Sequence, residues 1–79
     1  MNVSIMFFGA IADAVGSREL VFPAKGPLTT KVLIDELSQL HPALAKHKLL
    51  IAVNETYAEP DTILNNGDSV AIFTAVSGG

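Results

Sequence analysis

The sequence predicts an α+β fold, a roll in which one main helix packs on one face of a sheet of about four to five strands. Short apolar segments bounded by glycine, proline and asparagine recur along the 79 residues, which is typical of strands in a small domain. One segment near the middle repeats its leucines at helical spacing. A helix and three or more strands of this kind can enclose a single core.

The first two apolar segments predict a hairpin. Val3 to Phe8 is apolar and ends at Gly9, and Glu19 to Phe22 is a second strand that Pro23 ends. The connection Ala10 to Gly16 is expected to be a short turn or loop. Alternation along the first strand separates two sets of side chains, namely Val3, Ile5 and Phe7 on one face and Ser4, Met6 and Phe8 on the other.

After a loop rich in glycine and proline (residues 23–27), the chain predicts its main helix. Thr29 is a plausible N-cap, and the helix is expected to run to about Leu40. It ends before His41-Pro42, because a residue that precedes proline avoids the α region. One helical stripe is apolar and is expected to face the sheet: Leu33, Leu37 and Leu40.

The rest of the chain predicts further strands. Leu49 to Val53 is a third strand, Asn54-Glu55 a turn, and Thr56 to Ala58 a short edge strand. Asn65 to Asp68 is a tight-turn signal that precedes the last strand, Ser69 to Thr74. In that last strand the two faces divide the apolar residues, with Val70 and Ile72 on one and Ala71 and Phe73 on the other.

Only one face of the sheet can be covered by a single helix. The opposite face is then expected to expose Met6, Phe8, Ala71 and Phe73 unless a partner binds there.

Composition excludes several classes of function. The chain has no cysteine, so a disulfide framework and cysteine metal sites are excluded, and a cytoplasmic location is expected. The net charge of -3 argues against nucleic acid binding, which needs a basic face. No apolar run is long enough to span a membrane, and no signal peptide pattern is present.

Catalytic and metal-binding patterns are also missing. His41 and His47 do not have helical ligand spacing, so no metal site is predicted and both are expected to lie exposed near a helix end. The scattered Asp and Glu residues are expected to form a solvated surface rather than a converging acid/base pair. No phosphate-binding glycine loop is present, so no cofactor is expected to bind this chain.

The C-terminus is the distinctive feature. The chain ends in Ser77-Gly78-Gly79 directly after a strand. Two glycines make a thin, conformationally free strip of backbone that can thread a narrow channel and carry the terminal carboxylate into a remote active site. We therefore expect a domain over residues 1–74 and a flexible tail over 75–79.

A set of motifs is distributed along nearly the whole chain: Phe7-Phe8-Gly9, Val15-Gly16, Ala52-Val53-Asn54 with Thr56, Leu64, Gly67-Asp68-Ser69-Val70-Ala71-Ile72-Phe73, and Val76-Ser77-Gly78-Gly79. Taken together, these motifs resemble the small subunit of molybdopterin synthase, the MoaD family of sulfur carriers, and more broadly the ubiquitin-like β-grasp proteins. Typical members have two prolines where this chain has Thr74-Ala75.

The resemblance implies a β-grasp roll with a mixed sheet, and a carrier rather than a standalone enzyme. A separate adenylating enzyme would use ATP to activate the Gly79 carboxylate, which then becomes a thiocarboxylate. The tail, with Val76, Ser77 and Gly78, would enter the active site of the large synthase subunit, in an assembly of two small and two large subunits. Sulfur would pass to the pyranopterin precursor. The apolar face with Phe8 and Phe73 would bind the partners.

Three alternatives remain open from the residues. The first is a sulfur carrier for another product, such as the thiamine thiazole or a thiolated tRNA base, with the same tail chemistry. The second is a ubiquitin-like modifier in which Gly79 forms an isopeptide bond with a lysine, which covalent adducts on other proteins would reveal. The third is a non-covalent binding module, which predicts that deleting Gly78 and Gly79 leaves function intact.

Overall fold

The fold is a five-stranded mixed sheet with helices on one side, seen in a computed structural model that describes residues 1–74. Residues 75–79, the predicted tail, lie outside the described residues. In chain order the elements are β1 (Asn2–Phe7), α1 (Ala10–Val15), β2 (Glu19–Pro23), β3 (Leu28–Thr29), α2 (Thr30–Leu40), the 3₁₀ helix η1 (Pro42–Lys46), β4 (Leu49–Val53), β5 (Thr56–Tyr57), β6 (Ile63–Leu64) and β7 (Ser69–Thr74).

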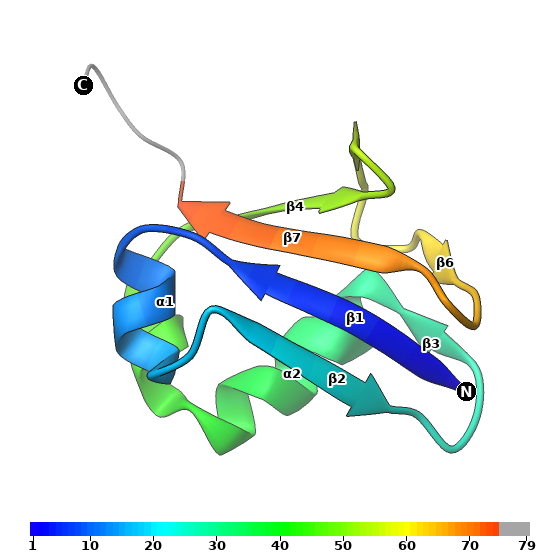
Figure 1. Ribbon diagram of the computed structural model, residues 1–79, viewed down its shortest axis with the longest axis horizontal. Helices are drawn as coiled ribbons and strands as arrows, with labels where there is room; N and C mark the ends of the chain where they lie inside the picture. Colours follow the sequence, from blue (N-terminus) through cyan, green and yellow to red (C-terminus); the bar gives the residue numbers. More distant parts are fainter. Residues whose placement is uncertain (75–79) are drawn as a thin grey trace.

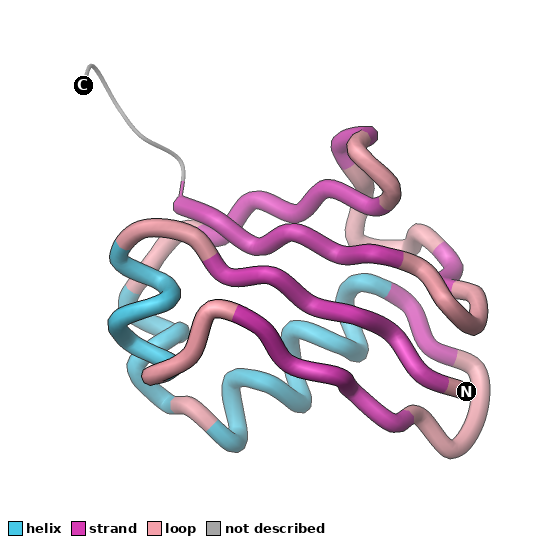
Figure 2. The backbone as a smooth tube through the Cα atoms, viewed as in Figure 1, coloured by secondary structure: helices cyan, strands magenta, loops and turns pink. Residues whose placement is uncertain are grey.

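The sheet has the strand order β2-β1-β7-β4-β5. The first and last strands, β1 and β7, lie parallel at its centre, and the other neighbours are antiparallel. Figure 1 shows α2 crossing behind these strands, so the face of the sheet turned to the viewer carries no helix. The tube in Figure 2 shows the same two layers. The predicted α+β roll is confirmed.

The core lies between the sheet and α2, and the alternation in the sequence decides which side chains enter it. The predicted inward residues of β1 and β7 are almost fully buried, as are two leucines of α2, namely Val3, Ile5, Phe7, Val70, Ile72, Leu33 and Leu37. Full burial of each such side chain contributes about 1.5–3 kcal/mol.

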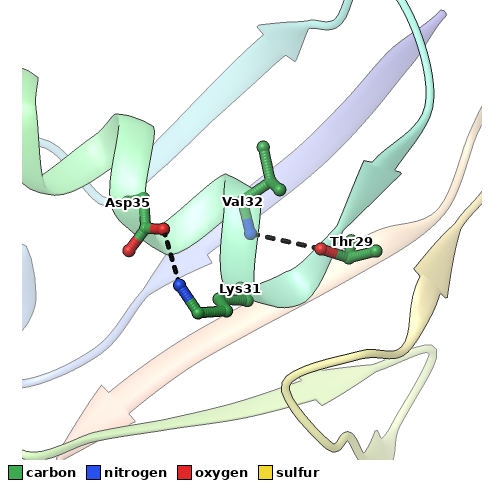
Figure 3. Close-up of polar contacts among 4 residues, drawn as sticks. All are labelled: Thr29, Lys31, Val32 and Asp35. Carbon is green, nitrogen blue, oxygen red and sulfur yellow. Dashed lines mark hydrogen bonds and ion pairs between the residues drawn. The ribbon is translucent and has the colours of Figure 1, made fainter.

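The start of α2 is fixed by the predicted cap. The Thr29 hydroxyl accepts a hydrogen bond from the Val32 N–H at 3.2 Å, which satisfies one of the free donors of the first turn. Figure 3 shows this cap beside an ion pair between Lys31 and Asp35, one turn apart on the helix surface, with 3.1 Å between Nζ and Oδ2. The helix ends at Leu40, before His41-Pro42, as predicted.

Leu40 does not join the core, so this part of the predicted stripe is wrong. Its side chain is 66% exposed, whereas Leu37 is fully buried. The helix ends at Leu40, and the chain then turns into η1, whose Leu44 is fully buried and closes the core at that end.

The segment expected to be a loop after β1 is the helix α1, which corrects the prediction. Its Ile11 is fully buried, and Ala14 and Val15 pack against the core. The helix is bounded by Gly9 at φ 56° and Gly16 at φ 82°, positive values that favour glycine. A helix of six residues is unstable alone, so contacts with the core stabilise it.

Several elements are too short for the spacing of apolar residues to predict them. The pair β3 and β6 and the helix η1 are absent from the predicted order, whereas β5 lies at the sheet edge as expected. Gly67 has φ 87°, in agreement with the predicted tight turn. The β4–β5 hairpin turns on Asn54 and Glu55, at φ 49° and 71°, values that suit a two-residue primed turn.

Candidate functional site

The candidate site is the sheet face that α2 leaves uncovered, which we call the open face. Its position follows from the register: Met6 lies opposite Ala71, Ala71 opposite Ala52, and Phe73 opposite Leu50. Because opposed residues point to the same side of a sheet, these side chains form one continuous surface. The open face consists of Met6, Phe8, Val21, Leu50, Ala52, Tyr57, Ala71 and Phe73.

The four residues predicted for this face all lie on it. Met6 and Phe8 are 37% and 49% exposed, and Ala71 and Phe73 are half-buried among their neighbours. The Phe8 N–H donates to the Ile72 carbonyl at 3.1 Å, which continues the β1–β7 ladder by one residue and holds Phe8 at the end of the sheet. The structure therefore brings together the four apolar residues that the alternation of side chains along the strands predicts for this face.

Two larger members of the open face were missed in the sequence. Leu50 lies opposite Phe73, and Tyr57 of β5, which is 74% exposed, has its ring centroid 6.0 Å from that of Phe73. The signal was available in the alternation of β4 followed by a two-residue turn, which returns Tyr57 to the same side as Ala52.

The centre of the open face carries no charge. The side chains contributed by β7, β4 and β5 are all uncharged, and Glu19, a carboxylate at the margin, lies opposite Met6 on the edge strand β2. Contiguous exposed apolar surface with charge only at its margin is typical of a protein-binding site.

The open face adjoins the point where the chain continues into its C-terminal residues. Thr74, the last described residue, pairs with Leu49 at the end of the sheet near Phe8 and Phe73. The predicted carrier group Gly79 and the threading residues Val76, Ser77 and Gly78 lie outside the described residues. The structure therefore locates the base of this segment at Thr74, beside the open face.

A polar network at the other end of the sheet fixes the register between β4 and β7. The Asn54 amide donates to Asp68 Oδ1 at 3.0 Å and accepts from the Ser69 N–H at 3.0 Å, and the Asn65 N–H donates to Asp68 Oδ2 at 2.8 Å. The Asn65 N–H and then the Asn54 amide lower the pKa of Asp68, because both stabilise its charged form. This register places Leu50 beside Phe73.

No metal-binding cluster accompanies the open face in the described part of the chain. Among residues 1–74, no three histidine or acidic side chains gather where they could hold a metal ion. His41 and His47 flank η1 at the two ends of that helix and are both partly exposed. Helices in these residues are also too short and polar to cross a membrane.

Comparisons with known proteins agree with this geometry. The chain is 35% identical over 83 aligned positions to the molybdopterin synthase sulfur carrier subunit of Mycobacterium tuberculosis, an alignment that covers 100% of this chain and 99% of that protein. Its fold matches the crystal structure of SAMP1 from Haloferax volcanii with a TM-score of 0.85 at 26% identity, over 100% of both chains.

A third similar protein has been solved as a complex. It belongs to the complex of subunits 1 and 2 of the molybdopterin-converting factor from Helicobacter pylori, and it matches with a TM-score of 0.70 at 24% identity over 100% of both chains. The model of the ThiS family matches residues 5–79, from the middle of β1 to the Gly-Gly end. This chain, a small ubiquitin-like domain with an apolar open face, belongs to the ThiS family.

Proposed function

We propose that this chain is the sulfur-carrying small subunit of a molybdopterin synthase, with the Gly79 carboxylate as its carrier group. The observation that supports the proposal most is the apolar open face, which ends where β7 runs on toward Gly78-Gly79. A surface that binds a protein, next to a thin C-terminal strip, can hold the partner while the strip carries the Gly79 carboxylate into the partner's active site. The name of the Mycobacterium tuberculosis relative points to the same role.

The chemistry begins with activation of a poor electrophile. A separate adenylating enzyme joins the Gly79 carboxylate to the α-phosphate of ATP, which releases pyrophosphate and leaves an acyl adenylate. Sulfide, as HS⁻ supplied by the donor, then attacks the carbonyl carbon to form the C–S bond, AMP leaves with the electron pair of the broken C–O bond, and the thioacid loses its proton. The product is a thiocarboxylate, which later gives its sulfur to the pyranopterin precursor.

The tail residues have a steric task in this scheme. Gly78 and Gly79 have no side chains, so the last two residues can pass through a channel that a Cβ would block. Val76 and Ser77 connect this strip to the domain and would line the mouth of the same channel. In this proposal the partner supplies the catalytic groups.

The open face is the docking surface for the large subunit in this proposal. The Helicobacter pylori protein is named as part of a complex between subunits 1 and 2 of its converting factor, which is the type of assembly we propose here, with two small and two large subunits in the cytoplasm. We assign the binding to Phe73 and Phe8, supported by Met6 and Ala71. Exposed aromatic residues at the centre of an interface contribute most to affinity.

A second function has support from the solved structures. The Haloferax volcanii protein is named SAMP1 and is similar in fold and length. Related solved structures name it a small archaeal modifier protein. If this chain were such a modifier, Gly79 would form an isopeptide bond with a lysine of another protein. Both functions start from the same adenylate and separate only at the attacking nucleophile.

The decisive experiment is intact mass spectrometry after incubation with the adenylating enzyme, ATP and a sulfur donor. The proposal expects a mass gain equal to the replacement of one oxygen by sulfur, located at Gly79, and sulfur transfer once the large subunit and precursor are added. A chain that lacks Gly78 and Gly79 is the matched control and should gain nothing. Conjugates to lysines without any thiocarboxylate would instead establish the modifier.

A further inference from the structure

Each edge of the sheet leaves backbone groups of one residue unpaired in the described part of the chain. At the β2 edge, the Ala24 N–H donates to the Met1 carbonyl at 2.8 Å, so the even-numbered residues of β2 bond to β1 and the odd-numbered ones face outward. The first of these odd-numbered residues is Glu19, and its carbonyl accepts a hydrogen bond from the Ser17 hydroxyl at 2.7 Å. Pro23 has no N–H to offer. Among residues 1–74, this edge therefore leaves Val21 with both its N–H and its C=O unpaired, between a partly covered Glu19 and a residue without a donor.

The other edge leaves one residue of β4 unpaired. The Asn54 N–H donates to the Ser69 carbonyl at 2.8 Å, so alternation turns the N–H and C=O groups of the odd-numbered residues of β4 away from β7. Ile51 is still covered, because its carbonyl accepts from the Ala58 N–H at 3.0 Å. Leu49 is not: within residues 1–74, neither its N–H nor its C=O has a partner on that side.

A groove of about 450 Å³ lies beside Leu49, between α2 and the edge of β4. Ile34 and Ile51, both half-buried, contribute apolar walls, and the Lys31–Asp35 ion pair borders the groove on the helix. The loop at Pro60 is held on the helix by the Lys31 N–H, which donates to the Pro60 carbonyl at 2.8 Å. The groove is thus a formed surface with an apolar interior and a charged border.

This groove is continuous with the open face. Leu50 and Tyr57 belong to the open face and also line the groove. A partner that covers the open face as far as Leu50 and Tyr57 therefore reaches the rim of the groove, which is the adjoining apolar surface with unpaired backbone groups.

We propose that the groove between α2 and the Leu49 end of β4 binds an extended segment of the large subunit. The Leu49 N–H donates to a backbone carbonyl of that segment, and the Leu49 carbonyl accepts from one of its N–H groups. One apolar side chain of the segment fills the groove, as in other cases where a peptide adds a strand to a sheet edge. This inference rests on the proposed function, because it assigns a second contact to the same partner.

The test is calorimetric titration of the large subunit with two variants of the full chain. Leu49→Pro removes the N–H at the first position of a strand, where proline is tolerated. It should raise the Kd about tenfold or more, because it leaves the partner's carbonyl unpaired. Leu49→Val is the matched control, since it keeps the N–H, and it should change the Kd by less than about threefold.

A second variant acts on the groove and leaves the backbone unchanged. Ala58→Phe fills the groove from β5 and keeps the hydrogen bond to Ile51, so it should also raise the Kd about tenfold. Thermal unfolding of each variant checks that the fold is retained.

Phe73→Arg on the open face separates the two proposals. If Phe73→Arg weakens binding while folded Leu49→Pro and Ala58→Phe bind like the wild type, the groove is not part of the interface and the carrier function stands. If the wild-type chain does not bind the large subunit, both proposals fall. Groove variants that abolish self-association in sedimentation experiments, without changing the Kd, would show that a second copy occupies the groove and would also overturn this inference.

Discussion

Tyr57 and Phe73 join the edge hairpin of the sheet to its central strand. Their ring centroids lie 6.0 Å apart with the ring planes inclined by 53°, an arrangement worth about 0.5–1.5 kcal/mol beyond the buried area. Tyr57 remains 74% exposed, so this contact leaves most of its ring free. A rigid, exposed tyrosine that is held by a neighbouring ring is well suited to bind a protein partner.

Tyr57→Ala should weaken binding of the large subunit by about ten- to a hundredfold, because it removes an aromatic anchor from the open face. Ile63→Ala is a suitable control, since Ile63 is equally apolar and 70% exposed but lies on β6, outside the five-stranded sheet. Titration calorimetry measures both. Equal affinities for the two variants would remove Tyr57 from the interface.

Phe73→Arg should weaken the same binding more strongly and cost about 1–2 kcal/mol of unfolding free energy, because the half-buried ring loses its contact with Tyr57 while the arginine head can reach water. Urea denaturation and titration with the large subunit give the two quantities. A variant that fails to fold would mean that Phe73 acts as a core residue.

Gly79→Leu should abolish sulfur transfer without changing stability, because the added side chain cannot pass where two glycines do. The measurement is the yield of sulfur-containing product with the large subunit, together with a thermal melt. The residue lies outside the described part of the chain, so the prediction follows from the steric argument alone. Normal transfer by this variant would contradict the role of the tail.

Leu37→Ala should lower the unfolding free energy by about 2–5 kcal/mol, the usual cost of a cavity at a fully buried leucine. Leu40→Ala, one turn later on the same helix, should change it by less than about 1 kcal/mol because Leu40 is 66% exposed. Denaturant unfolding compares the pair. Similar losses would indicate that Leu40 packs more than its exposure suggests.

Asp68 should contribute to stability above its ordinary pKa of 3.8 and lose that contribution as the pH falls. Hydrogen bonds from Asn65 and Asn54 lower the pKa of the folded state, so the unfolded chain binds the proton more readily in acid. Asp68→Asn should therefore flatten the fall in stability below about pH 4. Thermal melts across that range test this, and an unchanged acid profile would show that the carboxylate has no net effect.

The residue pattern in the sequence is sufficient to predict the main architecture and half of the residues that form the open face. The two-residue period of β1 and β7 separates buried Ile5 and Ile72 from Met6 and Ala71 on the open face, because a strand turns successive side chains to opposite faces whatever its neighbours are. The Thr29 cap is equally local, since a hydroxyl and an N–H three residues later form it. The Gly-Gly end is visible in the sequence itself.

Tertiary contacts decide the remainder. The segment Ala10–Val15 is helical because its Ile11 is buried in the core. Leu44 rather than Leu40 closes the core at the end of α2, because the chain turns into η1 there. The meeting of Tyr57 with Phe73 depends on strand order, which brings together residues from different strands. Local propensities differ by only about 1 kcal/mol, whereas burial of one large side chain contributes more, so contacts distant in the sequence determine these elements.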